Sequence, residues 1–304
     1  MAKYLVTGGA GFIGSNLVDK LIEKGHEVVV IDNLSTGKKE NINPSAKFYQ
    51  FDICDIDKIY GAFDGVKFVF HLAAIPSVPM SIQDPVGTSE INILGTINVL
   101  RAAQVAGCKR VIFASSSAVY GDQKEFPIKE SAVLNFKSPY ALHKLVGEQY
   151  ARLFTDIYKL PVICLRYFNV YGPRIDINSD YSLVIGKFLK LHAQNMPLTI
   201  FGDGNQTRSF CYVDDVIEAN IKASENDKLV GGEVINIGHE KSFSINSLAE
   251  LIGGKIQYLP ERLGDILHTQ ADISLAKELL NWEPKICLRD GVEKTKQWFL
   301  KNEE

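Results

Sequence analysis

The sequence lacks long apolar runs, paired cysteines and a large net charge, and each absence excludes a class of protein. No stretch approaches the roughly 20 apolar residues that span a bilayer, and the first residues lack the apolar core of a signal peptide. The 5 cysteines are scattered without a C-x-x-C pair, which disfavours a disulfide framework. With 33 basic and 36 acidic residues, the net charge of −3 is too balanced for a protein that coats nucleic acid. We therefore expect a cytoplasmic protein that binds neither membranes nor nucleic acid.

Short apolar runs alternate with helix-periodic stretches in the first half of the chain, which is typical of repeated βαβ units. The runs are apolar at consecutive positions, as in parallel strands that helices cover on both faces. They occupy residues 5–6, 28–31, 68–70, 111–113 and 162–165. The pattern predicts an α/β fold with a Rossmann-type, doubly wound parallel sheet.

The alternation fades in the second half, where turn signals such as Tyr171-Gly172-Pro173 separate shorter elements. We expect residues 1–167 to form the Rossmann-type domain and residues 168–304 mainly a smaller α/β lobe. Helical periodicity near 214–223 leaves open that later segments return to the first domain.

Three glycines, Gly8, Gly11 and Gly14, follow the first predicted strand. Without side chains they let backbone N–H groups approach a pyrophosphate, and the helix that begins here adds a partial positive charge. Asp32 ends the second predicted strand, 32 − 14 = 18 positions beyond the last glycine. This arrangement predicts a dinucleotide-binding site, with a structural turn as the alternative.

Asp32 favours NAD over NADP, because its carboxylate can accept hydrogen bonds from ribose hydroxyls and would repel a 2′-phosphate. An aspartate at a strand end can also cap a turn, and the residues that follow resemble one. Lys38 and Lys39 are the main observation against NAD. Asp52 and Ile53 end a further predicted strand, which lies between the runs at 28–31 and 68–70. They are candidate adenine contacts, although an acidic strand end is more often a solvated loop.

Ser138 and Pro139 predict the start of a helix, because serine is a good N-cap and proline suits the first helical position. Tyr140 then lies in the first turn, and Lys144, four residues on, lies on the same face. An ammonium beside a phenol lowers the phenol pKa from about 10 toward physiological pH. This predicts Tyr140 as a general base, although the same spacing occurs by chance on many helices.

Ser115, Ser116 and Ser117 follow an apolar strand, at the sheet edge where doubly wound folds bind ligands. With the other motifs, they make the chain from Lys3 to about Trp298 resemble the extended short-chain dehydrogenase/reductase family, and within it the nucleotide-sugar 4-epimerases. The motifs that carry the resemblance are the glycine pattern, Asp32, the serines before Val119-Tyr120-Gly121, the Tyr140/Lys144 pair and Arg166-Tyr167-Phe168-Asn169.

The resemblance implies three catalytic residues. Tyr140 would be the base, Lys144 would bind the nicotinamide ribose, and Ser116 would hydrogen-bond the reacting oxygen. Ser116 is chosen because it stands four residues before Tyr120, with Ser117 as the runner-up and a substrate contact. The implied cofactor is NAD, bound by Gly8, Gly11, Phe12, Ile13, Gly14, Asp32, Asn33, Ser35, Thr36, Gly37, Asp52, Ile53, Leu72, Ala73, Ala74, Asn92, Tyr140, Lys144 and Phe168.

The resemblance also implies a UDP-sugar substrate. Its predicted contacts, besides Ser116, Ser117 and Tyr140, are Asn169, Phe201, Arg208, Arg262, Asp265 and Thr269. The arginines would meet the diphosphate, since a planar guanidinium can bind two phosphate oxygens together, but a lone arginine more often forms a solvated ion pair. Thr269 occupies the position where family members differ in the space left for the substituent on C2 of the sugar, and threonine is small. We therefore expect the UDP-N-acetylglucosamine/galactosamine pair to be accepted besides UDP-glucose and UDP-galactose. Each pair would be interconverted through a 4-keto intermediate.

Two other functions stay open. A UDP-glucuronate 4-epimerase or decarboxylase would use the same scaffold, and a non-catalytic NAD-binding sensor would need the fold without the Tyr140, Lys144 and Ser116 set. A 4,6-dehydratase is disfavoured, because that family places a carboxylate where Ser117 stands. The 6 histidines show no metal-ligand spacing, so we expect no metal.

The resemblance further implies a homodimer. In this family, the helix around residues 91–106 and the helix after Tyr140 commonly form the seam. Ile91, Leu94, Val99 and Leu100 could supply apolar contacts, or could instead face the sheet.

Overall fold

The computed structural model describes residues 1–177, 184–261 and 267–302, and the chain divides into two compact units. The first unit comprises residues 1–119, 136–166 and 217–235, and the second comprises residues 120–135, 167–216 and 236–304. The division therefore differs from a single cut at residue 167. Residues 120–135 belong to the second unit and residues 217–235 return to the first.

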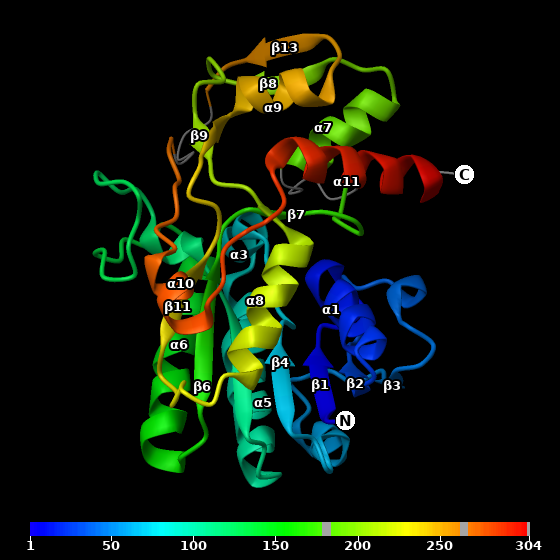
Figure 1. Cartoon of the computed structure of the whole chain (residues 1–304), viewed down its shortest axis with the longest axis vertical. Coiled ribbons are helices and arrows are strands. Elements are labelled where there is room, and N and C mark those ends of the chain that lie inside the picture. Colours follow the sequence, from blue (N-terminus) through cyan, green and yellow to red (C-terminus); the bar gives the residue numbers. More distant parts are fainter. Residues whose placement is uncertain (178–183, 262–266, 303–304) are drawn as a thin grey trace. The chain divides into compact units, whose positions relative to one another are not determined.

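The main sheet has 7 strands in the order β11-β6-β5-β4-β1-β2-β3 (Figure 1). They are β1 (Lys3–Thr7), β2 (Glu27–Ile31), β3 (Lys47–Tyr49), β4 (Phe68–His71), β5 (Arg110–Ser116), β6 (Val162–Tyr167) and β11 (Val234–Ile237). Neighbouring strands from β3 to β5 pair in parallel. Cys164 N–H donates to Glu233 O, and four residues on Phe168 N–H donates to Ile237 O, so β11 runs parallel to β6. This confirms the predicted Rossmann-type sheet.

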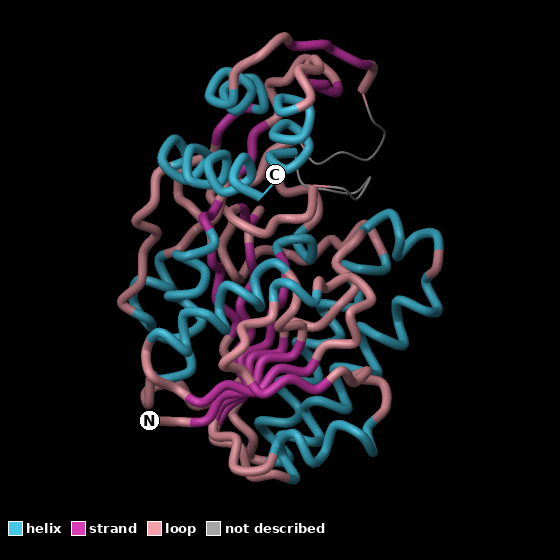
Figure 2. The backbone as a smooth tube through the Cα atoms, turned by 90° about the vertical axis from the view of Figure 1, so that its right-hand side faces the viewer, coloured by secondary structure: helices cyan, strands magenta, loops and turns pink. Residues whose placement is uncertain are grey.

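Helices cover both faces of this sheet, as Figure 2 shows with the sheet seen nearly along its plane. They are α1 (Phe12–Glu23), α2 (Ile56–Ile59), α3 (Val78–Gln83), α4 (Pro85–Ser89), α5 (Gly95–Val105), α6 (Pro139–Tyr158) and α8 (Val213–Glu225), with short turns η1 (Lys39–Asn41), η2 (Tyr60–Phe63), η3 (Glu90–Leu94) and η4 (Ser117–Tyr120). Successive strand residues point to opposite faces. Leu5 joins the core cluster that contains Leu100 of α5 and Phe154 of α6, whereas its neighbour Tyr4 stacks on Phe70.

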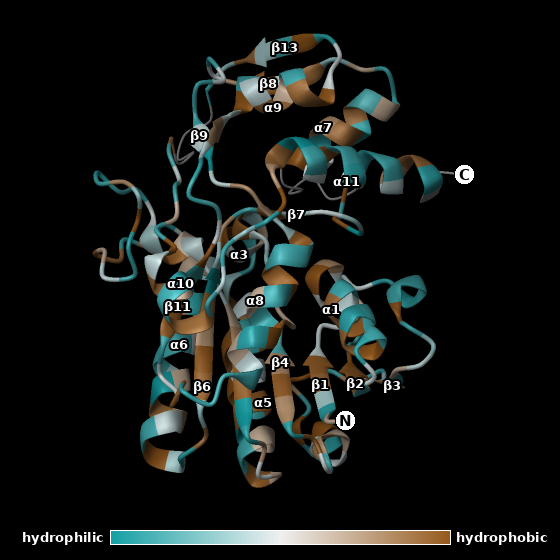
Figure 3. Ribbon diagram, in the orientation of Figure 1, coloured by the Kyte–Doolittle hydropathy of each residue, from teal (hydrophilic) through white to brown (hydrophobic). Residues whose placement is uncertain are grey.

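Burial on both faces explains why the strand segments are apolar at successive positions. In Figure 3, strands β4 and β6 are coloured mainly as hydrophobic. All four β4 residues and all six β6 residues are buried. The hydrophobic effect therefore favours this sheet over a one-sided, alternating one.

The second unit is built from small sheets and helices. Its elements are β7 (Val170–Tyr171), α7 (Val184–Ala193), β8 (Leu198–Phe201), β9 (Thr207–Arg208), β10 (Cys211–Tyr212), β12 (Phe243–Ser244), α9 (Ile245–Ile252), β13 (Ile256–Leu259), α10 (Ser274–Leu280) and α11 (Leu288–Asn302). β8 pairs in parallel with β13, and β9 pairs antiparallel with β12. Trp282 is buried and donates from its indole N–H to Asp215 O at 2.9 Å, so it is a packing residue. Across the described parts of both units, no helix combines the length and apolar character that a membrane span needs.

Helix α6 lies close against strand β5 at Gly147. A Cβ added to Gly147 would overlap the tip of the Phe113 ring. The ring has little room to move, because Phe113 is buried and lies 5.7 Å, centroid to centroid, from His71. The missing side chain of Gly147 therefore sets the distance between α6 and the sheet.

We predict that Gly147→Ala lowers the free energy of unfolding. Overpacking against Phe113 costs about 1–3 kcal/mol, which exceeds the gain of about 1 kcal/mol from replacing glycine in a helix. Urea denaturation measures the difference. Gly61→Ala is the control, because nothing lies within 4 Å of a Cβ there. Equal stability of the two variants would contradict the close contact.

Candidate functional site

The loop between β1 and α1 requires glycine at two of its positions. Gly8 has φ +72°, and a Cβ there would lie 2.7 Å from the backbone nitrogen of Ala73. A Cβ on Gly14 would overlap the carbonyl oxygen of Gly8. Helix α1 begins at Phe12, followed by Ile13, and its cap residue Gly11 offers no side-chain hydrogen bond. The loop therefore brings backbone close together beside a helix N-terminus, which suits a pyrophosphate.

Asp32 holds this loop from the end of β2. Its carboxylate accepts the Ala10 N–H at 3.0 Å and the Leu34 N–H at 2.8 Å. A carboxylate has about four acceptor positions, so it can cap this turn and still accept ribose hydroxyls. The turn continues through Ser35 and Thr36 to Gly37, whose added Cβ would lie 2.9 Å from Asp32 Oδ1.

Asp52 and Ile53 do not end a strand as predicted, because β3 ends at Tyr49 and both residues lie in the loop that follows it. Asp52 accepts a hydrogen bond from the Asn33 side chain at 2.8 Å and one from the Cys54 N–H at 2.8 Å. The Ile53 side chain is buried in the main core cluster. A Cβ on Gly95 of α5 would lie 2.5 Å from it. Ile53 thus helps to seat α5, and Asp52 shapes the loop in which Asn33 lies.

Asn92 shapes the segment after β4, where Leu72, Ala73 and Ala74 were predicted to contact the cofactor. Its amide accepts the Ile75 N–H at 2.8 Å and donates to Ile75 O at 3.1 Å. Asn92 lies in the π-helical turn η3, a distortion that is frequent at functional sites. The Ala73 N–H donates to the Thr7 hydroxyl at 3.3 Å. Asn92 therefore fixes this segment by pairing with its backbone.

His71 is a buried structural residue at the end of β4. Its two ring nitrogens lie 2.7 Å from the Thr7 hydroxyl and 2.9 Å from the Thr96 hydroxyl. Burial, with the charge of Lys144, lowers the pKa of His71 to about 3, so the ring is neutral at physiological pH. His71 is therefore a packed strand residue. No group of metal-binding side chains occurs within the ranges described above.

Helix α6 begins as the sequence predicts. The Ser138 hydroxyl accepts the Ala141 N–H at 3.2 Å, and Pro139 is the first helical residue. Tyr140 follows, and its N–H donates to the buried Ser81 hydroxyl at 3.0 Å. Lys144 comes one turn later. Its ammonium donates to the Ala114 carbonyl of β5 at 2.8 Å.

Tyr140, Ser116 and Lys144 come together where β5 ends and α6 begins. Ser116 is close enough to the Tyr140 phenol to lower its pKa, and Lys144 Nζ lies 5.9 Å from the centroid of the Tyr140 ring. Ser117 follows Ser116 directly as the first residue of η4. The predicted base, its neighbouring hydroxyl and the predicted cation thus form one cluster in the first unit.

The pKa of Tyr140 differs from the expectation. Burial raises it above its ordinary value, and the hydrogen bond with Ser116 lowers it by less. The predicted lowering by Lys144 is not among the causes of this shift, and the Lys144 ammonium donates to the Ala114 carbonyl. Burial also lowers the pKa of Lys144 to about 8, against the opposing charge of Glu148. Both side chains are therefore desolvated, so the phenolate form of Tyr140 and the ammonium form of Lys144 each need stabilising contacts from neighbouring groups.

Glu148 of α6 and Arg166 of β6 form a buried ion pair that was not predicted from the sequence. Glu148 accepts two hydrogen bonds from Arg166 of β6, at 2.8 and 2.7 Å, and one from the Ser115 hydroxyl at 2.5 Å. Glu148 lies four residues after Lys144, so the spacing Tyr140, Lys144, Glu148 along one helix face was the available signal.

The second unit places two of the predicted substrate residues together. The Thr269 hydroxyl accepts hydrogen bonds from the Asn169 amide at 3.3 Å and from the Ser209 N–H at 3.3 Å. Asn169 has φ +36° and also donates to Ser209 O at 2.9 Å. Thr269 is thus a buried residue whose hydroxyl organises the backbone around Asn169.

The other predicted residues of this unit lie on separate elements. Arg208 of β9 donates to Thr207 O at 2.9 Å and to Leu267 O at 3.2 Å. Phe201 ends β8, and its carbonyl accepts the Gln206 amide at 2.9 Å. Phe168 is fully buried. Arg262 and Asp265 lie outside the described residues.

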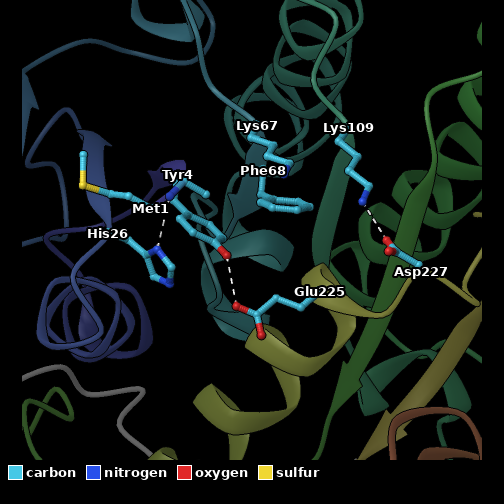
Figure 4. A pocket seen from close by; sticks show the side chains of 9 residues that line it. Met1, Tyr4, His26, Lys67, Phe68, Lys109, Glu225 and Asp227 are labelled. Carbon is cyan, nitrogen blue, oxygen red and sulfur yellow. Dashed lines mark hydrogen bonds and ion pairs between the residues drawn. The ribbon is translucent and has the colours of Figure 1, made fainter.

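A hollow of about 320 Å³ lies at the other end of the main sheet, at the amino ends of β1 and β4 (Figure 4). Its polar groups bond to one another. Lys109 pairs with Asp227 at 2.6 Å, and the Tyr4 hydroxyl donates to Glu225 at 3.2 Å. These pairs already satisfy the polar groups named, so we assign no ligand to this hollow.

Comparison with known proteins adds a family and three solved structures. The model of the NAD dependent epimerase/dehydratase family matches residues 4–238. A UDP-glucose 4-epimerase with UDP-glucose from Thermotoga maritima is 40% identical, with a TM-score of 0.95 over 99% of this chain and 100% of that one.

The two other structures are complexes with UDP-sugars other than UDP-glucose. A UDP-N-acetylglucosamine 4-epimerase from Methanobrevibacter ruminantium in complex with UDP-N-acetylmuramic acid is 39% identical, with a TM-score of 0.93 over 99% of this chain and 98% of that one. A UDP-glucuronic acid 4-epimerase from Bacillus cereus in complex with UDP-glucuronic acid and NAD is 34% identical, with a TM-score of 0.88 over 98% of this chain and 99% of that one.

Proposed function

The chain belongs to the NAD dependent epimerase/dehydratase family, and we propose that it is an NAD-dependent 4-epimerase of UDP-hexoses. The observation that carries the proposal is the cluster of Tyr140, Ser116 and Lys144, on a helix and a strand end that packing holds together. A non-catalytic NAD-binding protein would have no need of this buried set.

The cofactor end of the proposal rests on the first unit. The contact between Gly8 and Ala73 leaves no room for a side chain where a pyrophosphate would approach the backbone. Asp32 has acceptor capacity for the ribose hydroxyls of NAD and carries the charge that disfavours NADP. Bound NAD would supply a reversible hydride acceptor for C4 of the sugar, so the net reaction has no redox change.

The proton chemistry falls to Tyr140. Its phenolate would take the proton of the C4 hydroxyl as hydride passes from C4 to bound NAD, giving a 4-keto sugar, and would return that proton when hydride comes back to the opposite face of C4. The Ser116 hydroxyl would hold the reacting oxygen. Because burial raises the pKa of Tyr140, the positive charge of Lys144 is needed to stabilise the phenolate.

The substrate end of the proposal rests on the second unit. Asn169 would reach the diphosphate, Phe201 would flank the base, and Arg208 would bind phosphate oxygens. Arg262 and Asp265 are proposed on sequence alone. Ser117 stands where a dehydratase would need a carboxylate, which supports epimerisation over elimination.

A homodimer is the proposed assembly. Of the two alternatives for Val99 and Leu100, the core-facing one holds, because both side chains are fully buried in the main core cluster. Leu94, by contrast, is 47% exposed. The end of α6 adds three exposed apolar side chains, Leu153, Ile157 and Tyr158. Partner helices that covered these side chains would remove apolar surface from water.

We predict that Tyr140→Phe lowers kcat for UDP-glucose/UDP-galactose interconversion by about 100-fold or more, because it removes the general base. NAD binding should persist. The control is Tyr150→Phe on the same helix, which removes a phenol hydroxyl outside the cluster. A panel that includes UDP-glucose, UDP-N-acetylglucosamine and UDP-glucuronate defines the substrate. Turnover of none of them, or an unchanged rate in Tyr140→Phe, would refute the proposal.

Thr269→Tyr should restrict the substrate range. A bulky ring at this position would fill the space proposed for the C2 acetamido group, so turnover of the N-acetylated pair should fall at least about 10-fold more than that of the unsubstituted pair. Steady-state kinetics on both pairs measures this ratio. Thr269→Ser, which keeps the hydroxyl bonded to Asn169 and Ser209, should leave the ratio unchanged. Equal loss of both pairs in Thr269→Tyr would exclude a gatekeeping role.

Light scattering should give twice the monomer mass for the wild type. Ile157→Glu should shift the protein toward monomer, because a charge in the proposed seam is costly to desolvate. Ile82→Glu, which alters a similarly exposed isoleucine on α3, should remain dimeric. A monomeric wild type would rule out the dimer.

A further inference from the structure

Three successive residues of β5 each interact with one of three residues that repeat every four positions along α6. Ser116 lowers the pKa of Tyr140, the Ala114 carbonyl accepts a hydrogen bond from Lys144 at 2.8 Å, and the Ser115 hydroxyl donates one to Glu148 at 2.5 Å. The proposed function uses the first two of these interactions. The third has no assigned role, although it is built into the same strand and the same helix face.

Glu148 forms its ion pair in the protein interior. The exposed fraction of its side chain is 2%, and that of its partner Arg166 is 5%. Arg166 binds both carboxylate oxygens, and the Ser115 hydroxyl adds a third hydrogen bond. Burying an ion pair gives little net stability compared with apolar packing, because desolvation offsets the attraction. Stability alone therefore does not account for a carboxylate at this position.

We propose that Glu148 is a positioning residue of the Tyr140–Ser116–Lys144 site, whose buried carboxylate ties β5 to α6 and keeps the Lys144 ammonium charged. Arg166 holds the carboxylate in place, and Ser115 orients it toward β5. The effect on the reaction rate rests on the proposed function, whereas the effect on the charge of Lys144 does not.

The surroundings of Lys144 support this assignment. Its titratable neighbours are Tyr140, His143 and Glu148 on α6 and His71 on β4, and Arg166 of β6 pairs with Glu148. Burial lowers the pKa of Lys144 to about 8, and Glu148 is the neighbour that opposes this shift. The pKa values of both histidines are lowered by burial and by Lys144, so neither ring adds a positive charge at physiological pH.

Titration of Lys144 tests the proposal directly. In protein labelled with ¹³C at the lysine carbon next to the ammonium, NMR reports each lysine pKa, and Lys144→Met identifies the signal. Glu148→Gln should lower the pKa of Lys144 by roughly one unit or more, because an opposite charge is lost. Arg166→Lys, which keeps a positive charge beside the carboxylate, should not lower it. Ser115→Ala is the control that keeps the carboxylate.

A double variant covers the case in which Glu148→Gln leaves Arg166 buried alone and fails to fold. Glu148→Gln/Arg166→Met removes the ion pair as a unit, which proteins tolerate better than loss of one partner. Because Glu148 is the charge that opposes the shift of Lys144, the Lys144 pKa of the double variant should lie below that of the wild type. A Lys144 pKa equal to the wild-type value in Glu148→Gln or in the double variant would overturn the proposal.

The pH profile of kcat/KM for UDP-glucose gives the consequence for catalysis. Loss of the Lys144 charge should reduce the rate as pH rises through its pKa, so Glu148→Gln should move the basic limb to lower pH by the shift that NMR measures. A purely structural role would lower the rate at every pH and leave the limb in place, which would refute the proposal. If the wild type converts no UDP-sugar, the proposed function fails while the NMR titration still decides the role of Glu148.

Discussion

The site depends on one contact, the packing of α6 against β5. Gly147 lets the helix approach the Phe113 ring, and this approach brings the first turns of α6 to the carboxyl end of the strand. Charged and polar side chains are buried there at a cost, which hydrogen bonds across the same contact offset. The chemistry of Tyr140 and Lys144 is therefore inseparable from the packing that desolvates them.

Much of the first unit could be predicted from the sequence because its signals are local. Runs of buried strand residues, a Ser-Pro helix start and glycines in a tight turn each act within a few residues of their position. The Tyr140–Lys144 spacing, read on a helix, led to the site itself.

Other features could not be predicted, because they depend on distant parts of the chain. Nothing near Glu148 in sequence announces that Arg166 on β6 and Ser115 on β5 will meet it. The raised pKa of Tyr140 likewise follows from burial, which spacing along a helix does not report. In the second unit, short strands with weak patterning gave no warning that Thr269 would organise Asn169 and Ser209.

The alternation of the chain between its two units has a consequence for how the gene can be divided. Arg110, at the start of β5, is buried and bonds through its guanidinium to the carbonyls of Ala223, Ser224 and Leu229. A gene fragment that stopped near codon 167 would encode this cation without those acceptors, and would also omit the edge strand β11. The first unit, which holds the proposed nucleotide site, is therefore not encoded by one uninterrupted stretch of the gene, so recombination could not transfer it as a single segment.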